Sequence, residues 1–402
     1  MDKNLHSIYS YCCYSCIYIC FIYLDVSMIK LKIKKFLLGS IVMPLFYLFL
    51  SSCVVLHNPP IISTEDFISA VQNSGGTVNY IFEDERPFKE CHASTIVETA
   101  KGEMLSAWFG GTKEKNPDVA IWLSRWDGEK WNTPQKIAKV REEAHWNPVL
   151  FKDQDNIIYL FFKVGKDVPN WSTYWMKTVD SGKTWTEPTE LVPGDIGGRG
   201  PVKNKPIILH DGTWLAPAST EIKVWHCFAD RTNDKGITWI RSNDWDLESS
   251  GIRGKGVIQP TFWESQPNHV HALMRSTGGC IARCDSEDGG KTWGKVHRTD
   301  LPNNNSGIDL IKNIDGILWL VYNPIAGNWG PRNQLMLAYS KDNGKTWVEF
   351  VYLEKDLNPT HEYSYPAIIT TRKGIGISYT WRRERIKFWE IPNNLLKKYI
   401  AP

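Results

Sequence analysis

The sequence has almost no excess of charge of one sign. It carries 47 Lys and Arg residues against 44 Asp and Glu residues, a net charge of +3 over 402 residues. Residues 1–52 hold five Lys and two Asp, so they account for this excess and leave the rest of the chain neutral. Because proteins that bind nucleic acid usually present a strongly basic surface, we expect no nucleic-acid partner.

Cysteine is missing from the spacings that would indicate a metal site. None of the nine Cys residues is paired with His at the short spacing that zinc ligands use. Cys280 and Cys284 lie on one segment, where we expect packed core thiols rather than a disulfide framework. We therefore predict neither a metal site nor a cofactor.

The apolar run at residues 36–50 is short for a membrane-spanning helix. It has 15 residues, whereas such a helix needs about 20. The run is followed by two serines and Cys53, in the letters LSSC. Small residues directly after a short apolar run are typical of the cleavage site of an export signal. The basic residues that precede it are Lys30, Lys32, Lys34 and Lys35.

This N-terminal pattern resembles a bacterial lipoprotein box. The resemblance implies that Cys53 becomes the lipidated first residue of the mature protein; a plain membrane anchor is the alternative. We expect translation to start at Met28, a signal region at residues 1–52 and a linker at 53–77. The lipid would hold the protein in the cell envelope, at the outer membrane, in the periplasm or on the cell surface.

One motif returns at a fixed distance along the chain. Four stretches, such as SKDNGKTW at 340–347, follow the pattern Ser/Thr-x-Asp-x-Gly-x-Thr-Trp, and SRWDGEKW at 124–131 is a weaker relative. A fixed period indicates an array of one supersecondary unit. The stretches end, 54 residues apart, in Trp131, Trp185, Trp239, Trp293 and Trp347.

The segments between these stretches indicate β-strands. They are short β-branched and aromatic runs broken by Gly, Asp and Asn, and no long helical period occurs after residue 80. Four strands per 54 residues fit a propeller blade. We predict an all-β fold, a six-bladed β-propeller over residues 78–402. Five blades carry the motif, and the sixth closes the ring with N-terminal and C-terminal strands.

The repeated motif is expected to form a hairpin turn rather than a catalytic site. Its Asp can accept hydrogen bonds from backbone N–H groups two residues on. Its Gly supplies a positive φ that a Cβ would penalise. Its Trp would pack between neighbouring blades.

This motif is the Asp box, and on a six-bladed ring it resembles the sialidase superfamily. The phrases CHASTIV, PDVAIWLSR, GPVKNKP, NSGID and EYSYPAI resemble bacterial proteins described as predicted neuraminidases, over roughly residues 80–395. The resemblance implies an exo-glycosidase with three arginines on the substrate carboxylate. It also implies a Tyr nucleophile with a partner Glu, and an Asp as acid/base; the Tyr is an exception to the usual pair of carboxylates.

Carried over residue by residue, the resemblance implies four of these roles directly. Arg275 in RSTGG and Arg332 in GNWGPRNQL would bind the carboxylate. Tyr363 in EYSYPAI would be the nucleophile, and Asp118 in the loop GGTKEKNPDVAIW would be the acid/base.

Two positions depart from the family pattern. His92 stands where the first arginine is expected, and Gln259 stands where the partner Glu is expected. His cannot reproduce the bidentate fork of Arg on a carboxylate, and Gln cannot take a proton from a tyrosine. The site could therefore accept another acidic sugar, such as a uronate or a keto-acid sugar, with His92 as acid or base.

Several other polar residues could contact a sugar or serve the fold alone. Each has a structural alternative: a satisfied core histidine, a solvated loop, a closed turn, or a surface ion pair. The candidates are His145, Lys203, Lys205, Asn305, Asp309, Arg383 and, as a stand-in carboxylate, Glu221.

Three functions follow from this reading. The first is a sialidase-like exo-glycosidase that removes an acidic terminal sugar from a glycan. The second is a propeller polysaccharide lyase, in which His92 or His145 with a Tyr abstracts the C5 proton of a uronate. The third is a non-catalytic glycan-binding propeller. In each case we expect a monomer with a glycan or oligosaccharide partner and a membrane contact through the lipid.

Overall fold

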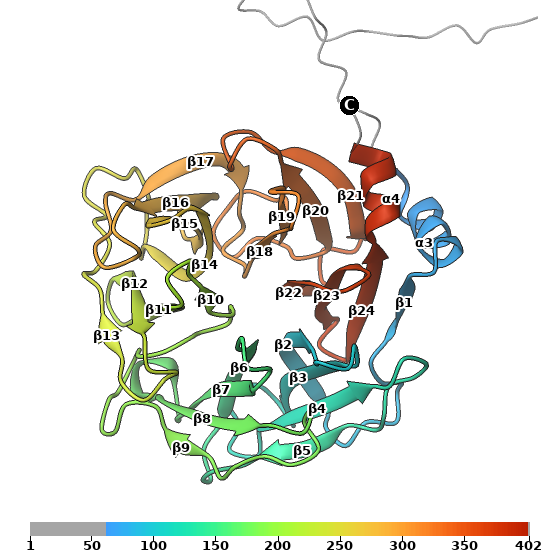
Figure 1. The fold of residues 1–402 in the computed structure, drawn as a ribbon, viewed down its shortest axis with the longest axis horizontal. Helices are drawn as coiled ribbons and strands as arrows, with labels where there is room; N and C mark the ends of the chain where they lie inside the picture. Colours follow the sequence, from blue (N-terminus) through green and yellow to red (C-terminus); the bar gives the residue numbers. More distant parts are fainter. Residues whose placement is uncertain (1–61, 401–402) are drawn as a thin grey trace, which may run out of the picture. The chain divides into compact units, whose positions relative to one another are not determined.

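The computed structural model describes residues 62–400, which form six four-stranded antiparallel sheets (Figure 1). The sheets surround a common centre, and the innermost strand of each one lies nearest to it. The predicted six-bladed β-propeller is therefore confirmed. Among these residues no helix has the length and apolar character to cross a membrane. Met28 and Cys53, and with them the signal and lipidation predictions, lie outside the described residues.

The blades follow one another along the chain with the same strand order. The first two hold β2 (Glu90–Glu98), β3 (Met104–Gly111), β4 (Ala120–Trp126), β5 (Gln135–Ala138), β6 (His145–Lys152), β7 (Ile158–Val164), β8 (Ser172–Thr178) and β9 (Thr189–Glu190), with the 3-10 helix η1 (Val168–Asn170) before β8. The next two hold β10 (Ile207–Ile208), β11 (Trp214–Glu221), β12 (Trp225–Thr232), β13 (Ile240–Arg241), β14 (Val257–Gln266), β15 (His269–Ser276), β16 (Cys280–Ser286) and β17 (His297–Pro302). The fifth holds β18 (Asp309–Lys312), β19 (Leu318–Tyr322), β20 (Gln334–Ser340) and β21 (Val348–Lys355).

The sixth blade closes the ring with strands from both ends of the described chain. Its inner three strands are β22 (Tyr363–Thr370), β23 (Gly374–Trp381) and β24 (Arg385–Pro392), and its outer strand is β1 (Thr77–Tyr80). In this pairing Thr77 lies opposite Glu390. The prediction that N-terminal and C-terminal strands share one blade is confirmed.

The segment predicted as a linker contains a helix. Helix α3 (Thr64–Asn73) begins after Ser63, whose side chain accepts a hydrogen bond from the Asp66 N–H. Its Phe67 is fully buried, with its ring 5.4 Å from that of Phe350 and 6.2 Å from that of Trp389. Residues 64–73 are therefore part of the folded domain, as is the short C-terminal helix α4 (Asn393–Ile400).

The Asp boxes form the turns between the third and fourth strands of five blades. The carboxylate of Asp180 accepts hydrogen bonds from the N–H groups of Lys183 and Thr184, both at 2.9 Å, and from the Thr184 hydroxyl at 2.6 Å. Asp288 and Asp342 repeat these bonds. The donors lie three and four residues after the Asp rather than two, because one carboxylate closes the whole turn.

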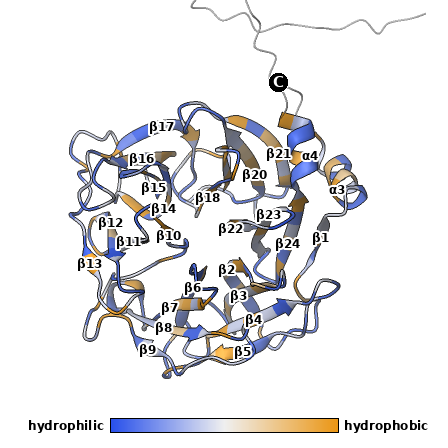
Figure 2. Cartoon of the chain, viewed as in Figure 1, coloured by the Kyte–Doolittle hydropathy of each residue, from blue (hydrophilic) through white to orange (hydrophobic). Residues whose placement is uncertain are grey.

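Apolar residues occur on the strands of every blade (orange in Figure 2). Their side chains form buried clusters between neighbouring sheets. The box tryptophans contribute to these contacts. The ring of Trp131 lies 5.2 Å from that of Phe388 in the preceding blade, and Trp239 lies 6.3 Å from Phe161. Cys280 and Cys284 are buried free thiols, as predicted.

Candidate functional site

One non-glycine residue with a positive φ lies near the N-terminal end of each inner strand, either at the third or fourth residue of the strand or four residues before its first. Such a conformation costs an L-residue about 1–3 kcal/mol and is found most often where function requires it. Six of them, one per blade, therefore mark one end of the ring as the candidate site. They are Ala93 (φ 55°), Asn147 (43°), Lys203 (64°), Gln259 (54°), Asn305 (60°) and Tyr365 (52°).

The strand ladders are irregular at the same places. Register shifts interrupt β2 after His92, β14 after Ile258 and β22 after Ser364. Gln259 and Tyr365 each precede a proline, which removes a ladder hydrogen bond. A bulge of this kind aims a side chain away from the regular alternation of a strand.

The irregularity of β22 decides which tyrosine faces the site. The hydroxyl of Tyr363, the predicted nucleophile, donates to the Asp356 carboxylate at 2.7 Å, and its ring belongs to the core of the closing blades. Burial raises the pKa of Tyr363 to about 12. Tyr365 instead lies among the residues predicted for the site. The resemblance implies Tyr363, but the structure places Tyr365 at the candidate site instead, because the bulge after Ser364 separates the two tyrosines and leaves Tyr365 against Arg275.

Arg275 is the centre of the cluster around Tyr365. Its Nη1 donates to the Tyr365 hydroxyl oxygen at 2.8 Å and to Gln259 Oε1 at 3.3 Å. Its Nε donates to Asn305 Oδ1 at 2.7 Å. The guanidinium also lies 5.4 Å from the ring centre of Trp329. Three predicted residues from different parts of the chain, Arg275, Gln259 and Asn305, thus meet at one place with Tyr365, which was not predicted.

Arg332 and Arg383 share a carboxylate that the sequence reasoning did not include. Glu362 accepts from Arg332 Nη1 at 2.9 Å and from Arg383 Nε at 2.8 Å. Burial raises the pKa of Glu362, but the charges around it, including these two guanidinium groups, outweigh burial and hold that pKa well below its usual range. Arg383 Nη1 also donates to Glu114 at 2.7 Å.

The cluster carries a small positive charge. Arg275, Arg332 and Arg383 contribute three positive charges, and Glu362 and Glu114 contribute two negative ones. Arg332 also lies 5.7 Å from the ring centre of Tyr365. The net charge of +1 suits a ligand that carries one negative charge. Of the three arginines, Arg275 forms no ion pair with a carboxylate of the described residues.

His92 lies against Tyr365 as a neutral ring. It is buried, its ring centre is 4.3 Å from that of Tyr365, and its Nδ1 has no hydrogen-bond partner among the described residues. Burial, and then the charge of Arg383, lower the pKa of His92 well below its usual value. A neutral imidazole can accept a proton, whereas it cannot hold a carboxylate as the expected arginine would.

Asp118 lies in the loop between β3 and β4, and it is exposed. Its carboxylate accepts from the N–H and the hydroxyl of Thr112 at 2.7 and 2.5 Å. Burial opposes this charge, but the hydrogen bonds from Thr112 outweigh it and lower the pKa of Asp118. The same loop reaches the cluster through Glu114 and its ion pair with Arg383, although no hydrogen bond joins Asp118 to the cluster in residues 62–400.

Lys203, Lys205 and Asp309 hold the blades together. Asp309 is buried and accepts from Lys205 Nζ and Thr261 Oγ1, both at 2.8 Å, and from the Ile368 N–H at 3.0 Å. The buried Lys203 Nζ donates to the Ile308 carbonyl at 2.8 Å, and burial lowers the pKa of Lys203 to about 7. The structure assigns these three residues, predicted as ligand contacts, to bonds between blades.

His145 also lies apart from the network of Arg275, and Glu221 makes no hydrogen bond with Arg275 among the described residues. His145 Nε2 accepts from the Val140 N–H at 2.8 Å and Nδ1 lies 2.9 Å from the Glu143 carbonyl, so both ring nitrogens are occupied. Burial lowers the pKa of His145 to about 4. Glu221 ends β11 and is partly buried; burial raises its pKa, and the charge of Arg275 opposes this rise.

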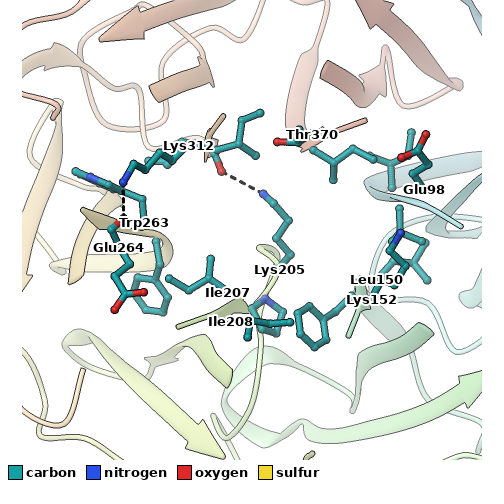
Figure 3. Close-up of a pocket in the computed structure, with 18 residues that line it drawn as sticks. Glu98, Leu150, Lys152, Lys205, Ile207, Ile208, Trp263, Glu264, Lys312 and Thr370 are labelled. Carbon is teal, nitrogen blue, oxygen red and sulfur yellow. Dashed lines mark hydrogen bonds between the residues drawn. The ribbon is translucent and has the colours of Figure 1, made fainter. Parts of the chain in front are cut away.

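The opposite end of the inner strands holds a separate cavity of about 440 Å³ (Figure 3). Every inner strand contributes residues from its C-terminal end, among them Glu98, Lys152 and Lys312. Lys205 reaches into it and donates to the Leu310 carbonyl at 3.1 Å, the bond that Figure 3 marks. Of the residues predicted for the site, only Lys205 lines this cavity.

Sequence reasoning missed Tyr365, Glu362 and Glu114. The phrase EYSYPAI contains both Tyr365 and Glu362, and the proline after Tyr365 was a signal that the inner strand bends there. The pairing of Glu114 with Arg383 joins residues 269 positions apart, and no local pattern could have indicated it.

Comparisons with known proteins agree with this architecture. Residues 102–377 match the family described as BNR repeat-like domain. The fold is similar to that of the Hadza microbial sialidase Hz136, with a TM-score of 0.65 at 18% identity, covering 79% of this chain and 69% of that one. It is also similar to the NanB sialidase of Streptococcus pneumoniae, with a TM-score of 0.62 at 14% identity over 79% and 71% of the two chains.

A third similar structure is the intramolecular trans-sialidase of the leech, complexed with 2,7-anhydro-Neu5Ac. Its TM-score is 0.60 at 14% identity, and the match covers 80% of this chain and 71% of that one. None of the curated proteins matches the sequence. At these identities the structural likeness concerns the fold.

Proposed function

Because this chain belongs to the family of BNR repeat-like domains, we propose that it is a sialidase-like exo-glycosidase that removes an acidic terminal sugar from a glycan. The observation that supports this most is the contact of Arg275 with the Tyr365 hydroxyl at 2.8 Å, with Arg332 5.7 Å from the same ring. A phenol beside two guanidinium groups suits a substrate whose carboxylate lies next to its reacting carbon.

In this proposal the cationic residues bind and orient the sugar. Arg275 and Arg332 hold the carboxylate through charge-assisted hydrogen bonds. Arg383 brings a third guanidinium beside β2, since the Cys91 N–H donates to the Arg383 carbonyl at 2.8 Å. Arg383 lies in the turn between β23 and β24. From there it contributes the positive charge that the neutral His92 does not supply.

The reaction then needs a nucleophile and two proton transfers. Tyr365 attacks the anomeric carbon, and neutral His92 takes the phenol proton in place of the missing glutamate. Asp118 gives a proton to the departing oxygen, and for this it must leave the hydrogen bonds of Thr112. Water then attacks the anomeric carbon of the glycosyl–tyrosine and gives a proton to Asp118, while the departing phenolate takes its proton back from His92, so that the free sugar acid is released and Tyr365 is restored.

Two tyrosines provide a matched test of this proposal. Digestion of a glycan panel, read by mass spectrometry, should show release of a free acidic sugar by the wild type. Tyr365→Phe should lower kcat/KM at least about 100-fold, because it removes the attacking oxygen. Tyr363→Phe should keep kcat/KM within about twofold of the wild-type value. This variant is the control for loss of a tyrosine hydroxyl that lies close to the site but does not react. Equal activity of wild type and Tyr365→Phe would refute the proposal.

A uronate lyase is the second candidate, and it is favoured by the neutral His92, whose Nδ1 has no hydrogen-bond partner in residues 62–400. There, His92 and Tyr365 would move the C5 proton while Arg275 neutralises the carboxylate. The product would carry a new double bond, which absorbs ultraviolet light. Appearance of this absorbance without hydrolysis would select the lyase, and binding without turnover across the panel would select a glycan-binding propeller.

A further inference from the structure

A serine, a histidine and an aspartate are linked in series far from the Arg275 cluster. Ser265 Oγ lies 2.8 Å from His271 Nε2, and His271 Nδ1 lies 2.5 Å from Asp285 Oδ1. The three residues come from β14, β15 and β16 of one blade. In this order a hydroxyl can pass its proton to an imidazole that a carboxylate orients.

The strand geometry accounts for the position of each group. A register shift between Glu264 and Gln266 leaves Ser265 out of the β14–β15 ladder, and such a bulge re-aims the side chain. His271 and Asp285 are direct partners in the β15–β16 pairing. Side chains opposite one another in antiparallel strands lie close enough to interact.

Neighbouring side chains hold the imidazole and the carboxylate in place. The ring of Trp263 stacks on His271 at 4.9 Å, and its Nε1 donates to Asn343 Oδ1 at 2.7 Å. Arg283 Nε donates to Asp285 Oδ1 at 3.0 Å, which holds the carboxylate beside His271 Nδ1. Asn343 comes from the last Asp box, so the site forms where two blades meet.

The chain provides space for a substrate beside these groups. A cavity of about 610 Å³ is lined by residues that include Ser265, His271 and Asn343, and all of its lining residues are polar or glycine. Lys312 lines it too, and its Nζ donates to the Ser265 carbonyl at 3.0 Å. The Asn343 amide, 3.2 Å from His271 Nε2, and the Lys312 ammonium are the donors that could face a developing oxyanion.

This place is distinct from the candidate glycosidase site. Ser265 lies six positions along β14 from Gln259, which belongs to the Arg275 cluster. At the rise of an extended strand this is roughly 20 Å. The two sets of side chains therefore cannot act on one bond.

We propose that Ser265, His271 and Asp285 form a second active site, which hydrolyses esters of short acyl groups on polar alcohols such as sugars. The polar lining supports this substrate class, since a long acyl chain would find no apolar wall there. Ser265 Oγ attacks the ester carbonyl as its proton moves to His271 Nε2. His271 returns that proton to the departing alcohol oxygen, which leaves an acyl-serine.

Water completes the cycle. His271 Nε2 takes a proton from water as the oxygen attacks the acyl-serine carbonyl, and the proton then returns to Ser265 Oγ. The products are the free alcohol and the carboxylic acid, and the serine is restored. Asp285 orients the ring through Nδ1, and it stabilises the imidazolium that forms.

The test uses the full-length protein with p-nitrophenyl acetate and a fluorophosphonate probe. We expect hydrolysis of the ester, and we expect the fluorophosphonate to label Ser265, located by peptide mass spectrometry. Ser265→Ala should lower kcat/KM for the ester at least about 100-fold and abolish the label. Asp285→Asn should lower kcat with little change in KM, because it disturbs the orientation of the base rather than substrate binding.

Ser69→Ala is the matched control, because Ser69 is an exposed serine on α3 whose hydroxyl donates to the Glu65 carbonyl and to no other group in the described part of the chain. It should leave both hydrolysis and labelling unchanged. Thermal unfolding of each variant shows whether it is folded, and the labelling of the wild type does not depend on any variant. Absence of label on Ser265 in the wild type, or equal ester hydrolysis by wild type and Ser265→Ala, would overturn the proposal.

Discussion

At the scale of single residues, the candidate site depends on the small number of carboxylates that pair with its three arginines. Glu362 is shared by Arg332 and Arg383, whereas Arg275 bonds neutral oxygens of Tyr365, Gln259 and Asn305. A substrate carboxylate would therefore meet Arg275 without displacing an ion pair. Its second contact, with Arg332, would compete with Glu362.

The proposed acid gives a test of pH dependence. Hydrogen bonds from Thr112 lower the pKa of Asp118 in this structure. Thr112→Val removes the hydroxyl that stabilises the charged form, so the pKa of Asp118 should rise. The limb of the pH–rate profile on which a protonated Asp118 is needed should then move to higher pH. An unchanged profile in this variant, measured beside the wild type, would exclude Asp118 as the acid.

Residue types were predictable from the sequence more readily than their orientations. Arg275, Gln259 and His92 are brought together as the family resemblance implied, and Asn305, predicted as a sugar contact or a turn residue, joins them. The resemblance implied Tyr363, and no local pattern shows that a bulge with a positive φ brings Tyr365 to the site instead. Hydrogen bonds that cross the ring, such as those of Asp309, depend on tertiary contacts that no local pattern records.

At the scale of elements, the Asp box is a turn closed by one carboxylate. Its period predicted the hairpins and the number of blades, because each box repeats the same local hydrogen bonds. Helix α3 was not predicted from the sequence. Only Phe67 and Val71 of its ten residues are buried, and two apolar positions are too few to show a helical period.

The Asp boxes should make stability sensitive to acid. Hydrogen bonds from Thr238 lower the pKa of Asp234 to about 2, whereas an unfolded Asp titrates near about 3.9. A lowered folded-state pKa gives stability that is complete above the unfolded pKa and is lost as pH falls toward 2.

Urea unfolding at pH 7, 4 and 2.5 measures this effect. Asp234→Asn should be less stable than the wild type at pH 7, and the difference should shrink between pH 4 and pH 2. A difference that stays constant over this range would show that the charge of Asp234 does not contribute.

Helix α3 should be needed for the closing blade. Phe67→Ala removes a fully buried ring from between Phe350 and Trp389, and it should cost about 3–5 kcal/mol of unfolding free energy. Gln72→Ala, an exposed change on the same helix, should stay within about 0.5 kcal/mol. Chemical unfolding of both variants checks this; equal midpoints would mean that the helix is not docked.

At the scale of the whole molecule, buried polar groups join the blades across the ring axis. Asp309 accepts hydrogen bonds from Lys205, Thr261 and Ile368, which belong to three other blades or their loops. The ring thus resists opening through its centre as well as through the closing pair of β1 and β24. This rigidity keeps residues far apart in sequence at one mouth.

Removal of this central carboxylate tests the argument. Asp309→Ala should cost about 3–5 kcal/mol, because it leaves the Lys205 ammonium without its partner. Asp300→Ala, at an exposed aspartate in the same region, should change the unfolding free energy by less than about 0.5 kcal/mol. Similar urea midpoints for the two variants would contradict a structural role for Asp309.

The most direct measurement of the central claim is the crystal structure of Asp118→Asn with a bound acidic sugar, sialic acid and glucuronic acid being tried in turn. We predict that the sugar carboxylate lies on Arg275 and Arg332 and that the carbon next to it faces the Tyr365 oxygen. A sugar whose carboxylate contacts neither guanidinium group, or one bound only in the cavity at the opposite end of the inner strands, would contradict the account.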